Sequence, residues 1–302
     1  MIGRRDKANA AAYAAAMQGN TEKRMDGSAL ARRLADEVRV NTMALKDCTG
    51  FEPTLAVVIV GDDPASHAYV RSTVKKCSQN GISTRLCELP ETTTTSKLLE
   101  LLSGLASDST VHGILLQHPL PRPIDSRAAF EAIPAAKDMD GVAATTMGRV
   151  VLGLPAFAPC TPTGIMRLLH EYKVELAGAD VVVIGRSPIV GKPLAALLTN
   201  ADATVTLCHS RTRNLPDLVR RADIACAAVG KPRFVSGDWI KPGAVVIDAG
   251  YHDGGVGDVD YAAALEHSRL ITPVPGGVGP MTIAVLMQHT LDAATQQLAH
   301  RY

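Results

Sequence analysis

The hydrophobic pattern of the chain alternates between short apolar runs and amphipathic stretches from residue 25 onward. Helical spacing places Leu30, Leu34 and Val38 on one face of a helix predicted over Ala29–Val40. The segments that follow are strands at Thr54–Val60, Ile82–Leu89 and Val111–Gln117, and helices at Ser66–Gln79 and Lys97–Ala106. Strands that alternate with helices in this way indicate a parallel sheet covered by helices.

The same alternation restarts at the sequence PCTPTG, Pro159–Gly164. The expected elements are a helix over Ile165–Tyr172, strands at Asp180–Ile184, Thr204–Cys208, Asp223–Ala228 and Ala244–Asp248, an additional strand at Leu270–Pro273, and a final helix over Thr282–Leu298. We therefore expect an α/β protein of two domains with a cleft between them. The boundaries are an extension over 1–24, a parallel α/β domain over 25–158 completed by the helix of 282–302, and a Rossmann-type domain over 159–281.

One stretch, VVVIGRSPIVGKP at Val181–Pro193, resembles a phosphate-binding turn. An apolar strand runs into Gly185, and Gly191 precedes the helix-compatible run Leu194–Leu198. A strand that turns through glycine into a helix presents free backbone N–H groups and the positive helix end at one point, which suits a nucleotide phosphate. The spacing differs from G-x-G-x-x-G, because Ser187 stands where a second glycine would be, so the turn alone is weak support.

Composition excludes several classes of partner. The 302 residues carry a net charge of +1, which argues against nucleic acid or an anionic membrane as the main partner. No apolar run approaches the roughly 18 residues of a membrane span. The six cysteines form no C-x-x-C pair, so we expect free thiols in a reducing cytoplasm and no metal site. Residues 1–24 lack the apolar core of a secretory signal and are interpreted as a frayed helical extension, with a transit peptide as the alternative.

The residues after the second strand of the Rossmann-type domain indicate the nucleotide. NAD-preferring folds usually carry an acidic residue there, which bonds the ribose hydroxyls. Here the strand ends in Cys208-His209-Ser210-Arg211-Thr212-Arg213, with no acid. Serine and arginine can bond a 2′-phosphate that an acid would repel. We therefore predict NADP as the cofactor, although two arginines on a solvated loop would be the simpler interpretation without the upstream turn.

From about Met25 to the end, the chain resembles the methylenetetrahydrofolate dehydrogenase/cyclohydrolase family, the FolD-type folate enzymes. The resemblance rests on five blocks in the family's order: Gly61–Ser66 with Tyr69-Val70, Gln117–Pro121, Lys137–Gly141, Gly185–Pro193 and Pro273–Thr282. It implies NADP-dependent oxidation of 5,10-methylenetetrahydrofolate to the methenyl form. In most members, hydrolysis to 10-formyltetrahydrofolate follows at the same site.

The resemblance also assigns roles to individual residues. Tyr69 matches the residue that stacks on the pterin, a role that suits an aromatic face. Asp140 matches the carboxylate that pairs with the pterin edge, and Gln117 belongs to the same catalytic set. The glycine-rich segment implied to lie between cofactor and substrate contains Pro275, Gly276, Gly277 and Gly279. The implied NADP contacts are Gly185, Arg186, Ser187, Gly191, Ser210, Arg211 and Tyr251. Considered one at a time, each of these residues could also have a purely structural role in packing, in a turn or as a cap.

The chain departs from the family at the catalytic lysine, which lies four residues after the tyrosine. Thr73 occupies that position. Lys75 points away on a helix, and Lys76 lies an extra turn along the axis. Hydride transfer depends mainly on positioning, whereas hydrolysis needs proton transfer that a threonine cannot provide as a base near neutral pH. Some dehydrogenase-only members of the family also lack the lysine. We therefore expect an active dehydrogenase with weak or lost cyclohydrolase activity.

Two alternatives stay open. One is a fully bifunctional enzyme in which Lys76 or His118 replaces the lysine; His118 stands where leucine is usual after the glutamine. The other is an inactive folate- or nucleotide-binding homologue. Thr146 also replaces a usual asparagine, which weakens the expectation for substrate detail near Asp140. The resemblance implies a cytoplasmic homodimer that acts on tetrahydrofolate one-carbon derivatives.

Overall fold

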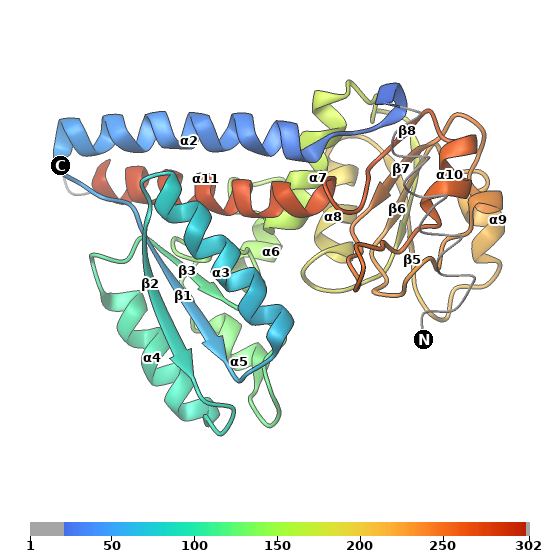
Figure 1. Cartoon of the computed structure of the whole chain (residues 1–302). Coiled ribbons are helices and arrows are strands. Elements are labelled where there is room, and N and C mark those ends of the chain that lie inside the picture. The colour runs from blue at the N-terminus through green and yellow to red at the C-terminus, as the bar shows by residue number, and fades with distance from the viewer. Residues whose placement is uncertain (1–20, 300–302) are drawn as a thin grey trace. The chain divides into compact units, whose positions relative to one another are not determined.

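The computed structural model describes residues 21–299, so most of the expected N-terminal extension lies outside the described residues. The described chain forms two compact units, each with its own parallel sheet (Figure 1). The first unit contains residues 31–160 and 283–299, and the second contains residues 21–30 and 161–282. The predicted two-domain α/β fold is thus confirmed.

The sheet of the first unit has the strand order β2-β1-β3, with every pairing parallel. The strands are β1 (Thr54–Val60), β2 (Ser83–Leu89) and β3 (Gly113–Leu116). The central strand β1 has the sequence TLAVVIV, and all of its residues after Thr54 are buried. A continuous run of β-branched and aliphatic residues is typical of a central parallel strand whose two faces are both covered.

The helices α3 (Pro64–Gln79), α4 (Thr95–Ser107) and α5 (Ser126–Glu131) cover this sheet, and α6 (Ala144–Val151) follows in the same unit. The start of α3 is determined locally. Pro64 occupies its first turn, and the Asp63 carboxylate accepts a hydrogen bond from the backbone N–H of Ser66 at 2.8 Å. Thr94 caps α4 in the same way through the N–H of Lys97. Because α3 follows β1 after a short turn, its first residues lie at the carboxyl end of the sheet.

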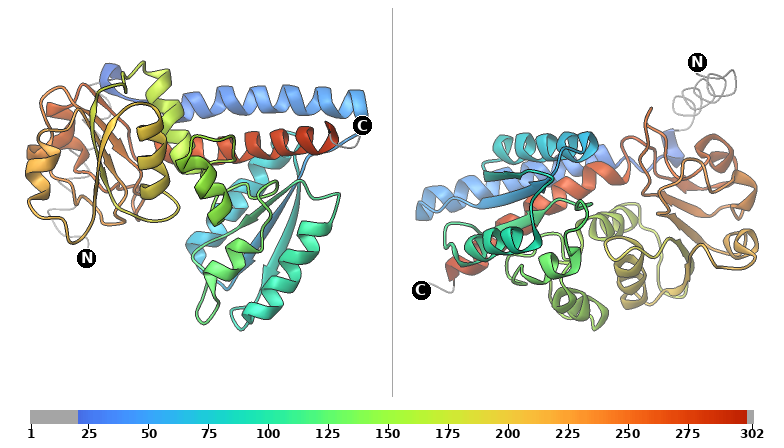
Figure 2. Two further views of the ribbon diagram at one scale, coloured as in Figure 1. Left: turned by 180° about the vertical axis from the view of Figure 1, so that it is seen from behind. Right: turned by 90° about the horizontal axis from the view of Figure 1, so that it is seen from below.

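Two long helices also contribute to the first unit, α2 (Gly27–Thr49) and α11 (Val278–Ala299). Within this unit, their residues 31–49 and 283–299 lie side by side in each view (Figure 2). Helix α11 is tied to its surroundings by Gln297, whose side-chain amide donates to the carbonyl of His112 at 2.9 Å. Helix α2 continues nine residues beyond the predicted end at Val40, because no glycine or proline interrupts the chain before Gly50.

The sheet of the second unit has the order β5-β4-β6-β7-β8, again entirely parallel. Its strands are β4 (Asp180–Ile184), β5 (Thr204–Cys208), β6 (Ile224–Ala227), β7 (Val245–Asp248) and β8 (Leu270–Ile271). Its helices are α7 (Cys160–Glu171), α8 (Gly191–Asn200), α9 (Leu215–Val219) and α10 (Tyr261–His267), with short 3-10 turns at η1 (Thr21–Lys23) and η2 (Gly237–Trp239). The strand order reverses direction between β4 and β6, which is the position where doubly wound sheets bind ligands.

Candidate active site

The site in the first unit is built at the carboxyl edge of its sheet. Gln117 and His118 follow β3 directly, and Asp140 lies two residues after Asp138, which forms an isolated parallel bridge with Ile114. The Gln117 side chain donates to the carbonyl oxygen of His118 at 2.7 Å. Carboxyl ends of parallel strands meet at one edge, so polar residues far apart in sequence are gathered there.

Tyr69 and Thr73 lie one turn apart on α3. Burial raises the pKa of the Tyr69 hydroxyl well above its usual range, and the negative charge of Asp140 raises it further, while the Thr73 hydroxyl opposes the shift. The predicted substrate residues Tyr69 and Asp140 are therefore neighbours in the structure. Thr73 is fully buried, and its Oγ1 has no hydrogen-bond partner of good geometry among the described residues.

His118 and Asp140 form a pair at this edge. Nε2 of His118 lies 3.4 Å from Oδ2 of Asp140, and the two side chains are 30% and 18% exposed. The His118 ring also meets the Phe130 ring edge-on, with centroids 6.5 Å apart. A partly accessible imidazole therefore lies beside the carboxylate of Asp140, a predicted substrate contact.

Asp138 holds the loop that carries Asp140. Its buried carboxylate accepts hydrogen bonds from the N–H groups of Val142 at 3.2 Å and Ala143 at 3.0 Å, and from the Thr146 hydroxyl at 2.9 Å. Burial raises the pKa of Asp138, and these donors oppose the shift. Thr146, expected only as a departure from the family pattern, thus has a definite role as a donor to Asp138.

The carbonyl preceding Asp140 is held by two further buried groups. The carbonyl oxygen of Met139 lies 3.1 Å from the thiol of Cys160 and 3.1 Å from Nδ1 of His289. Burial raises the pKa of the Cys160 thiol, and the neighbouring Asp140 adds to the effect. The sequence offered no signal for this cluster, because the residues come from three distant segments.

Lys137, although part of a family block, serves the fold. Its Nζ donates to the carbonyls of Leu105 at 3.3 Å and of Ala106 and Asp108 at 2.8 Å each. A cation that bonds these carbonyls stabilises the C-terminal end of α4. Lys137 is thereby directed at α4.

In the second unit, the predicted phosphate-binding turn has the close backbone packing that its glycines allow. Gly185 ends β4 with φ of +119°, and a Cβ atom there would overlap the carbonyl of Ala228. A Cβ atom on Gly191 would overlap the carbonyl of Gly185. Both positions require glycine for lack of space, and Gly185 also for its backbone conformation.

Ser187 stabilises this turn from within. Its Oγ accepts hydrogen bonds from the N–H groups of Val190 at 3.1 Å and Gly191 at 3.4 Å. Arg186 beside it is exposed. Ser187, predicted as a cofactor contact, thus already shapes the loop that opens α8.

The chain after β5 forms a tight turn that presents its polar side chains. The Thr212 hydroxyl accepts from the N–H of His209 at 2.8 Å, and Nδ1 of His209 accepts from the N–H of Arg211 at 3.2 Å. Ser210, Arg211 and Arg213 are all accessible at this turn. The predicted 2′-phosphate contacts are therefore open to solvent at the carboxyl end of β5.

Tyr251, also a predicted cofactor contact, is 72% exposed and follows β7. Two buried carboxylates hold the loop around it. Asp248 accepts from the N–H groups of Gly250, Asp258 and Val259 at 2.9 Å each. Asp258 in turn accepts from His252 at 2.8 Å. Sequence reasoning missed this pair, whose only signal was an acid at the end of a predicted strand.

The predicted glycine-rich segment lies against the start of α2. The carbonyl of Gly276 accepts from the N–H of Ser28 at 2.9 Å. Gly276 has φ of +103°, and a Cβ atom on Gly277 would lie 2.5 Å from the carbonyl oxygen of Pro273. The backbone of this segment therefore packs closely against Ser28 and against its own residue Pro273. Pro275 and Gly279 stay exposed.

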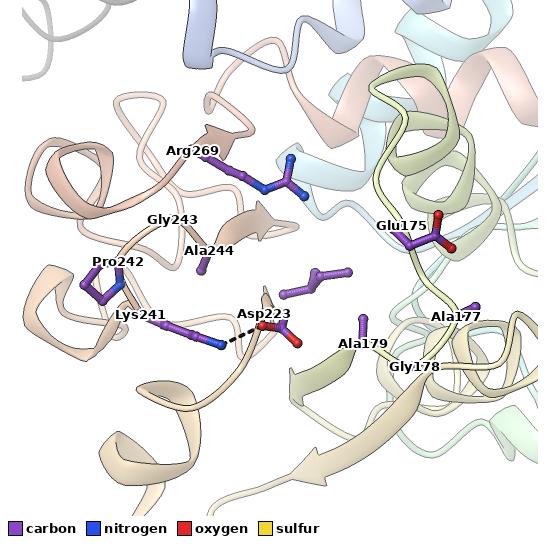
Figure 3. A pocket seen from close by; sticks show the side chains of 11 residues that line it. Glu175, Ala177, Gly178, Ala179, Asp223, Lys241, Pro242, Gly243, Ala244 and Arg269 are labelled. Carbon is purple, nitrogen blue, oxygen red and sulfur yellow. Dashed lines mark hydrogen bonds and ion pairs between the residues drawn. The ribbon is translucent and has the colours of Figure 1, made fainter.

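A pocket of about 370 Å³ lies at the opposite, amino edge of the second sheet (Figure 3). Its charged lining residues are Glu175, Asp223, Lys241 and Arg269. Lys241 is engaged with Asp223 through a contact of 2.6 Å. The candidate nucleotide site lies at Gly185 and the carboxyl ends of β4 and β6. The pocket lies at the amino ends of the same strands, so the two are distinct.

Neither a metal centre nor a membrane span is present between residues 21 and 299. No group of three or more His, Cys, Asp and Glu side chains in this range could hold a metal ion. Within the same range, no helix has the length and apolar character needed to cross a membrane.

Known proteins resemble both halves of the chain. The family model for the tetrahydrofolate dehydrogenase/cyclohydrolase catalytic domain matches residues 25–140, and that for the family's NAD(P)-binding domain matches residues 159–298. The Bifunctional protein FolD 1 of Streptomyces avermitilis is 57% identical over 278 residues, which cover 92% of this chain and 97% of that protein.

Solved structures agree with these matches. The bifunctional FolD enzyme of Campylobacter jejuni superimposes with a TM-score of 0.88 at 43% identity, covering 90% of this chain and 98% of its own. The Trypanosoma brucei FolD, solved with NADP cofactor and an inhibitor, gives 0.87 at 36% identity, covering 90% and 97%. The chain therefore belongs to the tetrahydrofolate dehydrogenase/cyclohydrolase family and contains its NAD(P)-binding domain.

Proposed function

We propose that this protein oxidises 5,10-methylenetetrahydrofolate to the methenyl form with NADP and hydrolyses that product to 10-formyltetrahydrofolate. The observation that carries the proposal is that Tyr69 neighbours Asp140, while Gln117 bonds the carbonyl of His118, whose ring lies 3.4 Å from Asp140. An aromatic face, an amide and a carboxylate supply what a flat pterin with donor groups on its edge requires. The catalytic roles of these residues rest on the family resemblance.

The bifunctional assignment replaces the dehydrogenase-only expectation as the leading one. Relatives that are 57% and 52% identical are named as bifunctional, and the matches cover nearly their whole length. Hydrolysis without a lysine at Thr73 then needs another group for proton transfer.

A dehydrogenase with weak or lost hydrolysis is the second candidate, and Thr73 is the observation that favours it. The side chain is fully buried and uncharged, and a hydroxyl cannot act as a base near neutral pH. Hydride transfer would persist, because it depends on placing the bridge carbon against the nicotinamide.

NADP is the proposed cofactor. The accessible Ser210 and Arg211 follow β5 without an accompanying acid in the turn, and both can bond a 2′-phosphate. The NADP-bound relative from Trypanosoma brucei supports the same choice. The cytoplasmic location and the homodimer stay predictions. Light scattering of the purified chain tests the oligomeric state.

Paired assays on the unaltered protein and on Thr73→Lys test these assignments. Reduction of NADP with methylenetetrahydrofolate measures the first step, and loss of methenyltetrahydrofolate absorbance measures the second. Hydrolysis by the unaltered protein supports the bifunctional enzyme. Hydrolysis only in Thr73→Lys supports the second candidate. A protein that reduces neither NADP nor NAD is an inactive binding homologue, and the enzymatic proposal then fails.

A further inference from the structure

We propose that His118, oriented by Asp140, is the proton-transfer group for hydrolysis of the methenyl bridge in this protein. The inference rests on the proposed function and identifies a residue for its second step. It begins from the 3.4 Å contact between Nε2 of His118 and Oδ2 of Asp140, at the sheet edge that also holds Tyr69 and Gln117.

The other ionisable groups around Asp140 are unsuited to exchange a proton near neutral pH. The pKa values of the Tyr69 hydroxyl and the Cys160 thiol are raised, chiefly by burial and additionally by Asp140, so both stay protonated. The Asp138 carboxylate already accepts three hydrogen bonds. Thr73 and Gln117 do not titrate. Histidine is the residue type that changes charge between pH 5 and 8.

The surroundings of His118 give its two ring nitrogens different roles. Asp140 beside Nε2 favours a proton on that nitrogen, which leaves Nδ1 as the acceptor. The side chain is 30% exposed, so water can reach the ring. A carboxylate that orients an imidazole for proton transfer is the arrangement found in acid–base triads.

The backbone and ring contacts of His118 limit its mobility. The Gln117 side chain bonds the His118 carbonyl at 2.7 Å, and Phe130 meets the imidazole edge-on. Asp140 is itself held by the Asp138-anchored loop and by the Met139 carbonyl contacts. The pair is therefore positioned before substrate arrives, as proton transfer requires.

The step balances without any oxidant or further reactant. Nδ1 of His118 takes a proton from water as the water oxygen bonds to the bridge carbon of the cationic methenyl group, which gives a neutral carbinolamine. The bond from this carbon to N5 then breaks, the imidazolium returns its proton to N5, and the hydroxyl proton leaves to solvent as the formyl carbonyl forms. The net reaction consumes one water and releases one proton.

The test compares His118→Leu and His118→Gln with the unaltered protein in both assays. We expect hydrolysis to fall by ~10²-fold in each variant, the scale of general acid–base catalysis. Dehydrogenase kcat should fall much less than hydrolysis in the same variants, since hydride transfer depends mainly on placement of the cofactor. His267→Leu, the same change at an exposed histidine in the last turn of α10, is the matched control for both assays.

The pH profile separates proton transfer from packing. Hydrolysis by the unaltered protein should depend on pH, and His118→Gln, which keeps a polar side chain, should lose that dependence. Lys76 is the other residue that could replace the family's lysine in proton transfer. Lys76→Met tests this possibility and should leave hydrolysis intact. Thr73→Lys in the His118→Leu background should restore hydrolysis, which a merely misfolded site would not allow.

The possible failures of the two proposals differ in their readout. An unaltered protein that reduces NADP but does not hydrolyse methenyltetrahydrofolate overturns the role of His118 and leaves the dehydrogenase standing. Equal hydrolysis in His118→Leu, a retained pH dependence in His118→Gln, or loss of hydrolysis in Lys76→Met also overturns it. If the unaltered protein does not reduce NADP, the proposed function itself fails, and the role of His118 fails with it.

Discussion

Gly185 and Ala228 approach each other so closely that any side chain on Gly185 would overlap the Ala228 carbonyl. The contact joins the carboxyl ends of β4 and β6, where the strand order of the second sheet reverses. Gly185 also has φ of +119°, a conformation that L side chains rarely adopt. This glycine therefore determines the shape of the candidate phosphate-binding turn.

Replacement of Gly185 by alanine should damage cofactor binding. The overlap forces β4 and the β6 loop apart, at a cost of about 1–3 kcal/mol in stability, and displaces the N–H groups that open α8. We expect the Kd for NADP to rise at least about tenfold, which corresponds to ~1.4 kcal/mol. Displacement of bound, fluorescent NADPH by NADP measures this constant.

Gly104→Ala is the matched control for this change. Gly104 lies inside α4, and a Cβ atom added to it would meet no other atom within 4 Å. The variant should bind NADP normally and gain about 0.5–1 kcal/mol of stability. Unchanged NADP affinity in Gly185→Ala would contradict the assignment of the turn.

Arg211→Ala should change the cofactor preference. Loss of one charge-assisted hydrogen bond of about 1.5–3 kcal/mol raises the KM for NADP by roughly ten- to a hundredfold, while the KM for NAD stays near its original value. Arg269→Ala, at the amino edge of the same sheet, should alter neither constant. Equal effects of Arg211→Ala on NADP and NAD would exclude a 2′-phosphate contact.

Lys137→Met should lower stability while folate kinetics are maintained. The substitution leaves the carbonyls at the end of α4 without their cation, which we expect to cost about 1–3 kcal/mol. A reduced midpoint of urea unfolding with an unchanged KM for methylenetetrahydrofolate is the expected result. A raised KM at unchanged stability would instead make Lys137 a substrate residue.

Asp248 should produce a measurable pH dependence of stability. Burial raises the pKa of its carboxyl to about 6, although three backbone N–H donors oppose the shift. The unfolded value is about 3.9, so between about pH 4 and 6 the folded state binds the extra proton. The contribution of this group is therefore fully present below about pH 4 and is lost as pH rises through about 6.

Asp248→Asn removes this titration and is compared with the unaltered protein by urea unfolding at pH 4, 5, 6 and 7. Relative to the variant, the unaltered protein should lose roughly 3 kcal/mol of stability across the window, from about two pKa units at ~1.36 kcal/mol each. Parallel stability curves for the two proteins would contradict the raised pKa.

Local sequence patterns predicted much of the fold correctly. The apolar run of β1, the glycine turn at Gly185 and the alternation of strands with helices depend on neighbouring residues, whose periodicity is visible in the chain. The short helices α5, α6, α9 and α10 escaped prediction, because segments of five to eight residues carry too few turns for helical spacing to emerge.

By itself, the sequence determined the α/β class and the family, since both are encoded in residue type and local spacing. The tertiary structure decided which side chains meet: that His118 faces Asp140, that Lys137 serves α4, and that Asp138 and Asp248 anchor loops. These contacts join segments far apart in the chain. They depend on strand order and on which sheet edge each loop reaches, and no local pattern specifies either.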